Sequence, residues 1–141
     1  MKADTPNHNG LKTLRTSGLV VIKNNKVLLT FSKNKKAWYL PGGKIELNET
    51  AVEALIRESK EELNLTLQPS ELHFLTTIKA RAFGEENVIM IQDCFMHNLQ
   101  QPIQPLAEIA AIKYFDYHAY RKEPQQVEGV IKIMEWLKLL K

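Results

Sequence analysis

Residues 41–65 read PGGKIELNETAVEALIRESKEELNL, and this stretch predicts a loop, a helix and a second loop. The Pro41-Gly42-Gly43 run is typical of a turn. Thr50 and Glu53 form a capping-box pattern, so we expect the helix to begin near Thr50. Apolar residues then recur at helical spacing and define a buried stripe, formed by Val52, Leu55, Ile56 and Leu63.

Three glutamates share one side of this helix. Glu58, Glu61 and Glu62 are separated by three and four residues, which places their carboxylates on a face beside the core rather than in it. Like charges so placed repel each other, so the cluster calls for a cation. Because the segment contains no His or Cys, we expect a hard ion, Mg²⁺, Mn²⁺ or Ca²⁺, rather than zinc. Mg²⁺ is usually shared with substrate phosphates, so we expect a phosphate-bearing substrate.

The same residues resemble the Nudix box, G-x5-E-x7-R-E-U-x-E-E-x-G-U, in which U is a bulky aliphatic residue. The matching positions are Gly43, Glu49, Arg57, Glu58, Glu61, Glu62 and Leu65. Ser59 stands where the pattern has an aliphatic residue, and Asn64 stands where it has glycine. Flanking segments that also look like the family are the Trp38–Gly43 run, Glu46, and Glu108-Ile109 followed by Tyr114-Phe115. The PGGKIE run is similar to the MutT-like branch.

This resemblance implies a fold and an activity. The fold is an α+β domain, layered α/β/α, in which a central mixed sheet lies between helices. The activity is Mg²⁺-dependent hydrolysis of a pyrophosphate linkage in a nucleoside diphosphate derivative, with Mn²⁺ able to substitute. Nucleoside triphosphates and nucleotide sugars both stay open as substrates.

The resemblance also implies roles for individual residues. Metal ligands are expected at Glu58, Glu61, Glu62 and the Gly43 carbonyl, with Glu61, Glu62, Arg57 and Glu49 serving catalysis. Substrate contacts are expected from Lys44, Glu46 and Trp38, although a plain loop acid is the alternative for Glu46. The general base stays open between Glu62 and a distal acid, with Glu85, Glu86 and Glu108 as the candidates. A solvated hairpin turn is the alternative for the Glu85-Glu86 pair.

The two departures from the pattern avoid every expected ligand. Asn64 falls just past the helix end, where a left-handed residue is wanted and asparagine is the usual substitute for glycine. Ser59 lies near the buried stripe, and we expect its hydroxyl to bond back to the Leu55 carbonyl.

The rest of the chain predicts the sheet. Apolar runs at residues 18–22 and 27–31 indicate one hairpin, and residues 72–82 and 88–98 indicate another. Residues 100–105 read as a loop and residues 110–117 as a further strand. Residues 127–140 carry the apolar spacing of a helix packed on the core.

Length and composition bound the alternatives. The 141 residues fit one domain at 16–141 after a flexible leader or edge segment at 1–15. A net charge of +3, one cysteine and no apolar leader favour a cytoplasmic protein without nucleic-acid or membrane partners. A small-molecule nucleotide is the expected partner, and the chain is expected to be a monomer or homodimer. The dense basic run is expected to be a solvated loop or a phosphate-steering patch; it comprises Lys33, Lys35 and Lys36.

Two other functions remain open. The first is a Nudix-fold nucleotide-binding or sensor module without hydrolysis, although such modules typically lose box carboxylates and this chain keeps them. The second is an interaction domain with an incidental acidic face. Aromatic residues that could stack on a base, or equally belong to the core, are Trp38, Phe83, Phe115 and Tyr117.

Overall fold

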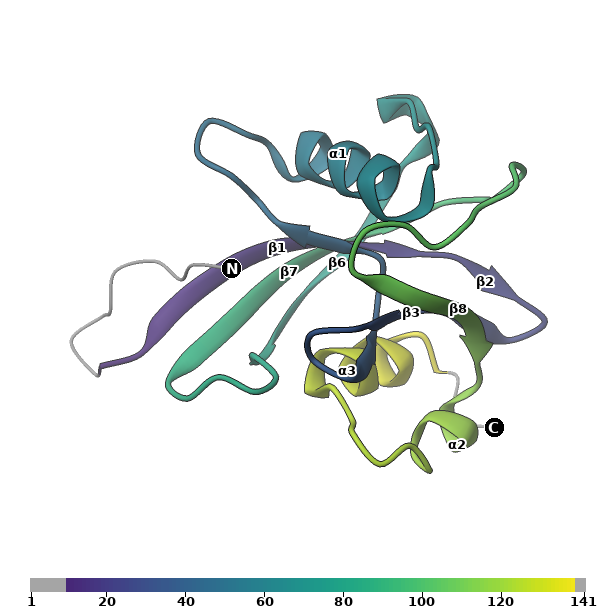
Figure 1. Cartoon of the computed structure of the whole chain (residues 1–141). Coiled ribbons are helices and arrows are strands. Elements are labelled where there is room, and N and C mark those ends of the chain that lie inside the picture. Colours follow the sequence, from purple (N-terminus) through teal and green to yellow (C-terminus); the bar gives the residue numbers. More distant parts are fainter. Residues whose placement is uncertain (1–9, 139–141) are drawn as a thin grey trace.

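The computed structural model describes residues 10–138, and two four-stranded sheets organise it (Figure 1). The larger sheet has the order β5-β1-β7-β6, with strands at Gly42–Lys44, Lys12–Val20, Val88–Met96 and His73–Arg81. β1 runs parallel to β7 along its whole length, while β5 and β6 add antiparallel edges. The sheet is therefore mixed, as predicted.

The smaller sheet is centred on β3, Lys26–Ser32. β8, Ile109–Phe115, pairs with one side of β3, and the short strands β2, Ile22–Lys23, and β4, Ala37–Tyr39, pair with the other. Asn24 and Asn25 join β2 to β3 with φ angles of 53° and 61°, the left-handed conformation that a tight hairpin turn requires. The hairpin predicted from residues 18–22 and 27–31 therefore forms only in part. Residues 22–23 pair with β3, whereas residues 18–20 belong to β1 of the larger sheet.

Two helices cover opposite faces of the larger sheet (Figure 1). Leu19 and Val21 pack in one core with α1, Ala51–Leu63, whereas Leu14 and Val20 pack in another with α3, Glu128–Trp136. Successive side chains of a strand point to opposite faces of the sheet, so this alternation shows that both faces are buried here. The α+β fold, layered α/β/α, is confirmed. Two short helical segments complete it, η1 at Pro69–Glu71 and α2 at Tyr117–Tyr120.

Helix α1 begins and ends largely as predicted. Thr50 is its N-cap, and Thr50 and Glu53 form the reciprocal bonds of a capping box. Asn64 ends the helix in the left-handed region at φ 54°, and its N–H donates to the Lys60 carbonyl at 3.2 Å. The expectation for Ser59 is wrong: its hydroxyl is buried and forms no hydrogen bond within residues 10–138.

The expected boundary at residue 15 falls inside a strand. β1 begins at Lys12, whose N–H donates to the Asn87 carbonyl at 2.8 Å, so residues 12–15 are paired sheet. Residues 1–9 of the expected leader lie outside the described residues, as does Leu140 of the expected last helix. Within residues 10–138, no helix is long and apolar enough to cross a membrane.

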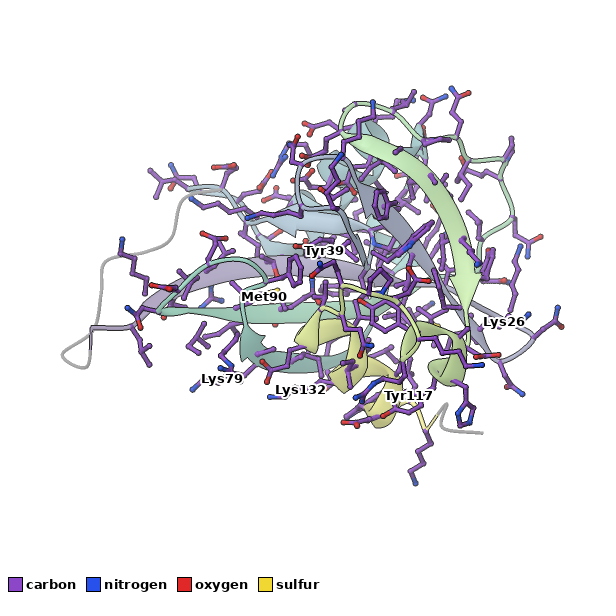
Figure 2. The ribbon with its side chains drawn as sticks, turned by 60° about the horizontal axis from the view of Figure 1, so that its bottom comes forward. Lys26, Tyr39, Lys79, Met90, Tyr117 and Lys132 are labelled. Carbon is purple, nitrogen blue, oxygen red and sulfur yellow. The ribbon has the colours of Figure 1, made fainter. Side chains whose placement is uncertain are left out.

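Side chains of α3 cap the outer edge of β6. Lys132 Nζ donates to the Lys79 carbonyl at 2.7 Å, and Glu128 Oε2 accepts from the Arg81 N–H at 3.0 Å. Lys132 and Glu128 also pair with each other at 3.6 Å. Figure 2 shows Lys79 and Lys132 side by side on this edge. We call these four residues the capped edge.

Candidate active site

Arg57 ties the loop before α1 to the helix. Its Nε and Nη2 donate to the two carboxylate oxygens of Glu49 at 2.8 and 2.9 Å, and Nη2 also donates to the Lys44 carbonyl at 3.0 Å. Glu49 in turn accepts from the Glu46 N–H at 2.9 Å. The hydrogen bonds from Arg57 lower the pKa of Glu49, so the pair stays ionised. Arg57 and Glu49 are thus joined to each other and to the backbone at Lys44 and Glu46.

Glu58 and Glu61 both approach the free side of the same guanidinium. Arg57 Nη1 lies 3.5 Å from Glu58 Oε2 and 3.6 Å from Glu61 Oε1. The Glu61 side chain is 54% exposed, whereas Glu58 is largely buried. Burial raises the pKa of Glu58 to about 7, against the opposing effect of Arg57.

Glu62 is buried, which corrects the prediction that the acidic face lies beside the core. The residue is 7% exposed, and its Oε1 accepts from the Gly42 N–H at 3.1 Å. Burial raises the pKa of Glu62 to about 8, although the bond from Gly42 opposes the shift. The face that α1 buries thus includes polar residues that apolar spacing alone does not identify, namely Ser59 and Glu62.

Two glycines bring backbone close to these acids. Gly42 and Gly43 form strand β5 rather than the predicted turn, and they pair with Gly18 and Ser17 of β1. Gly42 has φ +133°, and a Cβ there would overlap the Ser17 carbonyl. A Cβ at Gly43 would overlap Glu58 Oε2. Glycine at these positions therefore lets the carboxylates of α1 reach the strand.

A cavity of about 220 Å³ opens beside the acids and extends between the two sheets. α1 and the loops contribute its charged residues, and the strands contribute neutral ones. The lining comprises Thr16, Thr30, Ser32, Asn34, Lys35, Tyr39, Leu40, Gly42, Gly43, Glu58, Glu62, Met90, Gln92, Glu108 and Ile109.

Of the distal acids, Glu108 reaches the cavity. Backbone bonds from Gln104 to Leu63 and from Leu106 to Glu62 bring its loop against the end of α1. Glu108 lines the cavity and accepts from Asn34 Nδ2 at 2.8 Å. Glu85 and Glu86 line a different depression near the β6–β7 turn, and Glu85 lies 3.9 Å from Lys35 Nζ.

The predicted substrate contacts are absent from the cavity lining. Trp38 packs edge-to-face between Phe31 and Phe115, with ring centroids 5.2 and 5.0 Å away, and Tyr39 takes the cavity side of β4. Lys44, at the end of β5, and Glu46, in the loop before α1, do not line the cavity. Phe83, Phe115 and Tyr117 do not line it either.

The neutral lining of the cavity was not predicted from the sequence. Thr16 and Gln92 are buried polar residues on apolar strands, and they face each other across the β1–β7 ladder. A polar residue at an inward position of such a strand is a signal that the sequence contains. Which strands pair is not readable from it, so the two positions could not be joined.

The residues at the mouth of the cavity fit a hard divalent cation by their chemistry. Within residues 10–138 no three His, Cys, Asp or Glu side chains already form a cluster that could hold a metal ion. However, Glu58 and Glu62 are desolvated carboxylates beside the β5 backbone, and all the donors there are oxygens. Burying carboxylates is costly without a compensating charge, and a cation would supply it.

This combination of fold and glutamate-lined cavity is matched by a family model. The model of the NUDIX domain matches residues 12–137. The chain therefore belongs to the NUDIX domain family, and the predicted resemblance to MutT-like hydrolases is confirmed.

The sequence matches to individual relatives cover only about a third of the chain. An "ADP-ribose pyrophosphatase" from Methanocaldococcus jannaschii is 47% identical over 49 residues, 33% of this chain and 29% of the relative. An "8-oxo-dGTP diphosphatase" from Buchnera aphidicola is 38% identical over 52 residues, 34% of this chain and 40% of the relative. The matches thus span less than half the length of these relatives. The crystal structure of a MutT protein from Methanosarcina mazei Go1 has a TM-score of 0.72 at 16% identity, covering 89% of this chain and 93% of that one.

Proposed function

We propose that this chain hydrolyses a pyrophosphate linkage in a nucleoside diphosphate derivative and uses a divalent cation. One observation carries the proposal: two desolvated carboxylates, Glu58 and Glu62, meet the Gly42-Gly43 backbone at one end of a cavity of about 220 Å³. The named relatives, an ADP-ribose pyrophosphatase and an 8-oxo-dGTP diphosphatase, support the same reaction class.

Glu58, Glu61, Glu62 and the Gly43 carbonyl would hold Mg²⁺, for which Mn²⁺ would substitute. When bound, the cation neutralises phosphate charge and lowers the pKa of an attacking water. Phosphoryl chemistry of this kind depends mostly on positioning. Arg57 contributes to this positioning, because its bonds to Glu49 and to the Lys44 carbonyl would keep the loop between β5 and α1 in one conformation.

Basic side chains would attract the phosphates. Lys35 lines the cavity, and its Nζ lies 3.9 Å from Glu85, so it can turn toward an anion at the mouth. This favours the phosphate-steering role for Lys35. Lys44 follows the two glycines within β5, and its ammonium group would be the second basic group to contact a phosphate.

Glu108 is our choice for the group that accepts the proton from water. It lines the cavity together with Glu58 and Glu62, and its bond from Asn34 fixes the carboxylate. Glu62 remains the alternative as base. Glu85 and Glu86 are less favoured because neither lines the cavity.

The experiment that tests the proposal is turnover of Glu61→Gln with and without Mg²⁺ on a panel of nucleotides. We expect loss of Mg²⁺-dependent turnover by two orders of magnitude or more, roughly the scale of removing one electrostatic contact to the transition state. Glu135→Gln, on an exposed part of α3, is the matched control and should keep its rate. A wild-type rate in Glu61→Gln would overturn the metal role of Glu61.

A nucleotide-binding module without hydrolysis is the second candidate. The observation favouring it is that Glu58 and Glu61 both approach Arg57 and that residues 10–138 contain no ready-made metal cluster. Cleavage of the nucleotide, followed as a nucleoside monophosphate with its phosphate ester or pyrophosphate partner, separates the two functions. A chain that binds nucleotides but cleaves none of them with Mg²⁺ or Mn²⁺ is the sensor module.

A further inference from the structure

The loop between β3 and β4, residues 33–36, contacts the turn that carries Glu108. Lys33 bonds to this turn twice: its N–H donates to the Glu108 carbonyl at 2.9 Å, and its Nζ donates to the Ala107 carbonyl at 3.1 Å. Asn34 Nδ2 donates to Glu108 Oε2 at 2.8 Å. Two consecutive residues thus bind two consecutive residues at an offset of 74 positions in the chain. We call these four residues the clasp.

Both segments that form the clasp are closed by bonds of their own. Ser32 Oγ accepts from the Lys35 N–H at 3.1 Å, which closes the loop after β3. On the other side, the Ile109 N–H donates to the Leu106 carbonyl at 3.0 Å, which closes a four-residue turn. The clasp therefore joins two closed turns to each other.

The turn that carries Glu108 has an unusual backbone. Ala107 has φ 52°, in the left-handed region that alanine adopts less readily than glycine. Beside this turn, the β3–β8 register shifts at Ser32, as at a β-bulge, and bulges next to active sites redirect side chains. A strained residue keeps its conformation only where surrounding contacts hold it. Here Lys33 Nζ holds the carbonyl of the strained residue itself.

Glu108 depends on such bonds more than the other acids of the cavity do. Glu62 is buried and Glu58 is largely buried, so the atoms packed around them limit their motion. Glu108 lines the cavity but is an exposed residue, so packing does not confine its side chain. A group that takes a proton from water must stay within hydrogen-bond reach of that water. For an exposed carboxylate, hydrogen bonds must supply this restraint.

We infer that Lys33 is a positioning residue: it fixes the backbone that carries Glu108, so that the carboxylate stays in the cavity. Asn34 orients the carboxylate itself. The inference rests on the proposed function, because there Glu108 accepts the proton from the attacking water. It gives Lys33 a role different from the two expected from the basic run, a solvated loop or phosphate steering. Lys33 does not line the cavity, and it acts through Glu108.

The kinetic test is Lys33→Met, which removes the ammonium group but keeps the backbone N–H and the reach of the side chain. We expect kcat on the nucleotide panel to fall by about 10-fold or more through a misplaced base, with KM changed by less than about 2-fold. Lys33→Arg keeps a donor for the Ala107 carbonyl and should retain most of the rate. Lys26→Met removes an exposed lysine from the opposite end of β3, and this matched control should keep the wild-type kcat and KM.

Two comparisons separate positioning from the other roles of a lysine. A phosphate-steering lysine would raise KM in Lys33→Met, and the effect would weaken with added salt. A positioning lysine acts through Glu108, so Lys33→Met should cost no further kcat in a chain that already carries Glu108→Gln. A rise in KM with kcat unchanged, or an equal loss of kcat in both backgrounds, overturns the inference.

Amide hydrogen exchange of the metal-free protein tests the clasp without turnover. The Ile109 N–H reports on the turn, because it donates to the Leu106 carbonyl. We expect Lys33→Met to speed exchange at Ile109 by about 10-fold or more, while Lys26→Met leaves it unchanged. Unchanged exchange at Ile109 in Lys33→Met overturns the inference. Absence of wild-type turnover counts against the proposed function only, and exchange at Ile109 then decides whether Lys33 holds the turn.

Discussion

Glu62 is a carboxylate in an unfavourable place. It is buried, it accepts from the Gly42 N–H, and Glu58 and Glu108 add negative charge nearby. Burial is the main reason that the pKa of Glu62 rises to about 8, so near neutral pH the metal-free protein holds this side chain mainly protonated. A divalent cation must displace that proton, which links metal affinity to pH.

The first prediction follows from this raised pKa. Between the ordinary glutamate pKa of 4.5 and about 8, the folded chain binds more protons at Glu62 than the unfolded chain does. In the metal-free protein, the contribution of Glu62 to the free energy of unfolding is therefore fully present below pH 4.5. This contribution is lost as the pH rises through about 8. Glu62→Gln should flatten the decline, measured as urea midpoints from pH 5 to 9.

The control for this prediction is Glu135→Gln, which removes an exposed acid from α3. It should leave the pH dependence as in the wild-type chain. Added Mg²⁺ should raise the wild-type midpoint more at pH 8 than at pH 6 and should have little effect on Glu62→Gln. An equally steep decline in Glu62→Gln would show that Glu62 is not desolvated.

The second residue-scale prediction concerns the end of α1. Asn64 has φ 54°, a conformation that costs asparagine on the order of 1 kcal/mol relative to glycine. Asn64→Gly should raise the denaturation midpoint without changing activity, because Asn64 is exposed and does not line the cavity. Asn64→Ala should lower the midpoint. A lower midpoint in Asn64→Gly would contradict the account.

At the scale of elements, α1 is positioned by its contacts as much as by its apolar face. Arg57 joins the helix to the loop through Glu49 and the Lys44 carbonyl, and Glu62 joins it to β5 through Gly42. The helix is therefore attached at two points beside the cavity.

The third prediction tests the Arg57 attachment. Arg57→Lys keeps the charge but loses the two-pronged bond to Glu49, since an ammonium cannot reproduce the guanidinium fork. We expect kcat/KM to fall by about 10- to 100-fold through a misplaced loop, while the fold is retained. Kinetics and thermal midpoints measure the two effects. Arg15→Lys, on an exposed part of β1, is the matched control, and equal losses in both variants would remove the special role of Arg57.

The fourth prediction concerns the capped edge. β6 is the outer strand of the larger sheet, and Lys132 and Glu128 satisfy the Lys79 carbonyl and the Arg81 N–H. Unsatisfied edge groups are templates for pairing with another chain. Lys132→Ala with Glu128→Ala should therefore increase concentration-dependent association, measured by sedimentation. Lys122→Ala with Glu135→Ala removes the same charges elsewhere and should not.

Local signals predicted the elements well. The capping box and apolar spacing identified α1 from Thr50, and the loss of helical geometry at Asn64 was expected from its position. The sequence could not indicate that Gly42 and Gly43 pair with β1, because their partners lie more than twenty residues away. Short strands of this kind exist only through their partners and carry no periodicity of their own.

For the whole molecule, the residues of the site fall into two groups: those on one helix were predicted from sequence, and those on separate strands were not. Acids spaced along one helix were predicted from sequence, because helix geometry fixes their relation. Thr16, Tyr39 and Gln92 come from three strands that meet only in the folded chain, so no spacing predicted them. Trp38 was predicted as a substrate contact, whereas Tyr39 lines the cavity, and sequence does not tell which side of β4 faces the cavity.

The β1–β7 ladder also constrains the order in which this protein can be assembled. β1 starts at Lys12, yet the strand that flanks it along its whole length ends only at Met96. The whole box is thus synthesised before β1 gains that neighbour, and pairing must wait for a long loop to close. We expect ribosome-bound chains to resist protease only after Met96 has emerged. Protection of much shorter chains would contradict this order.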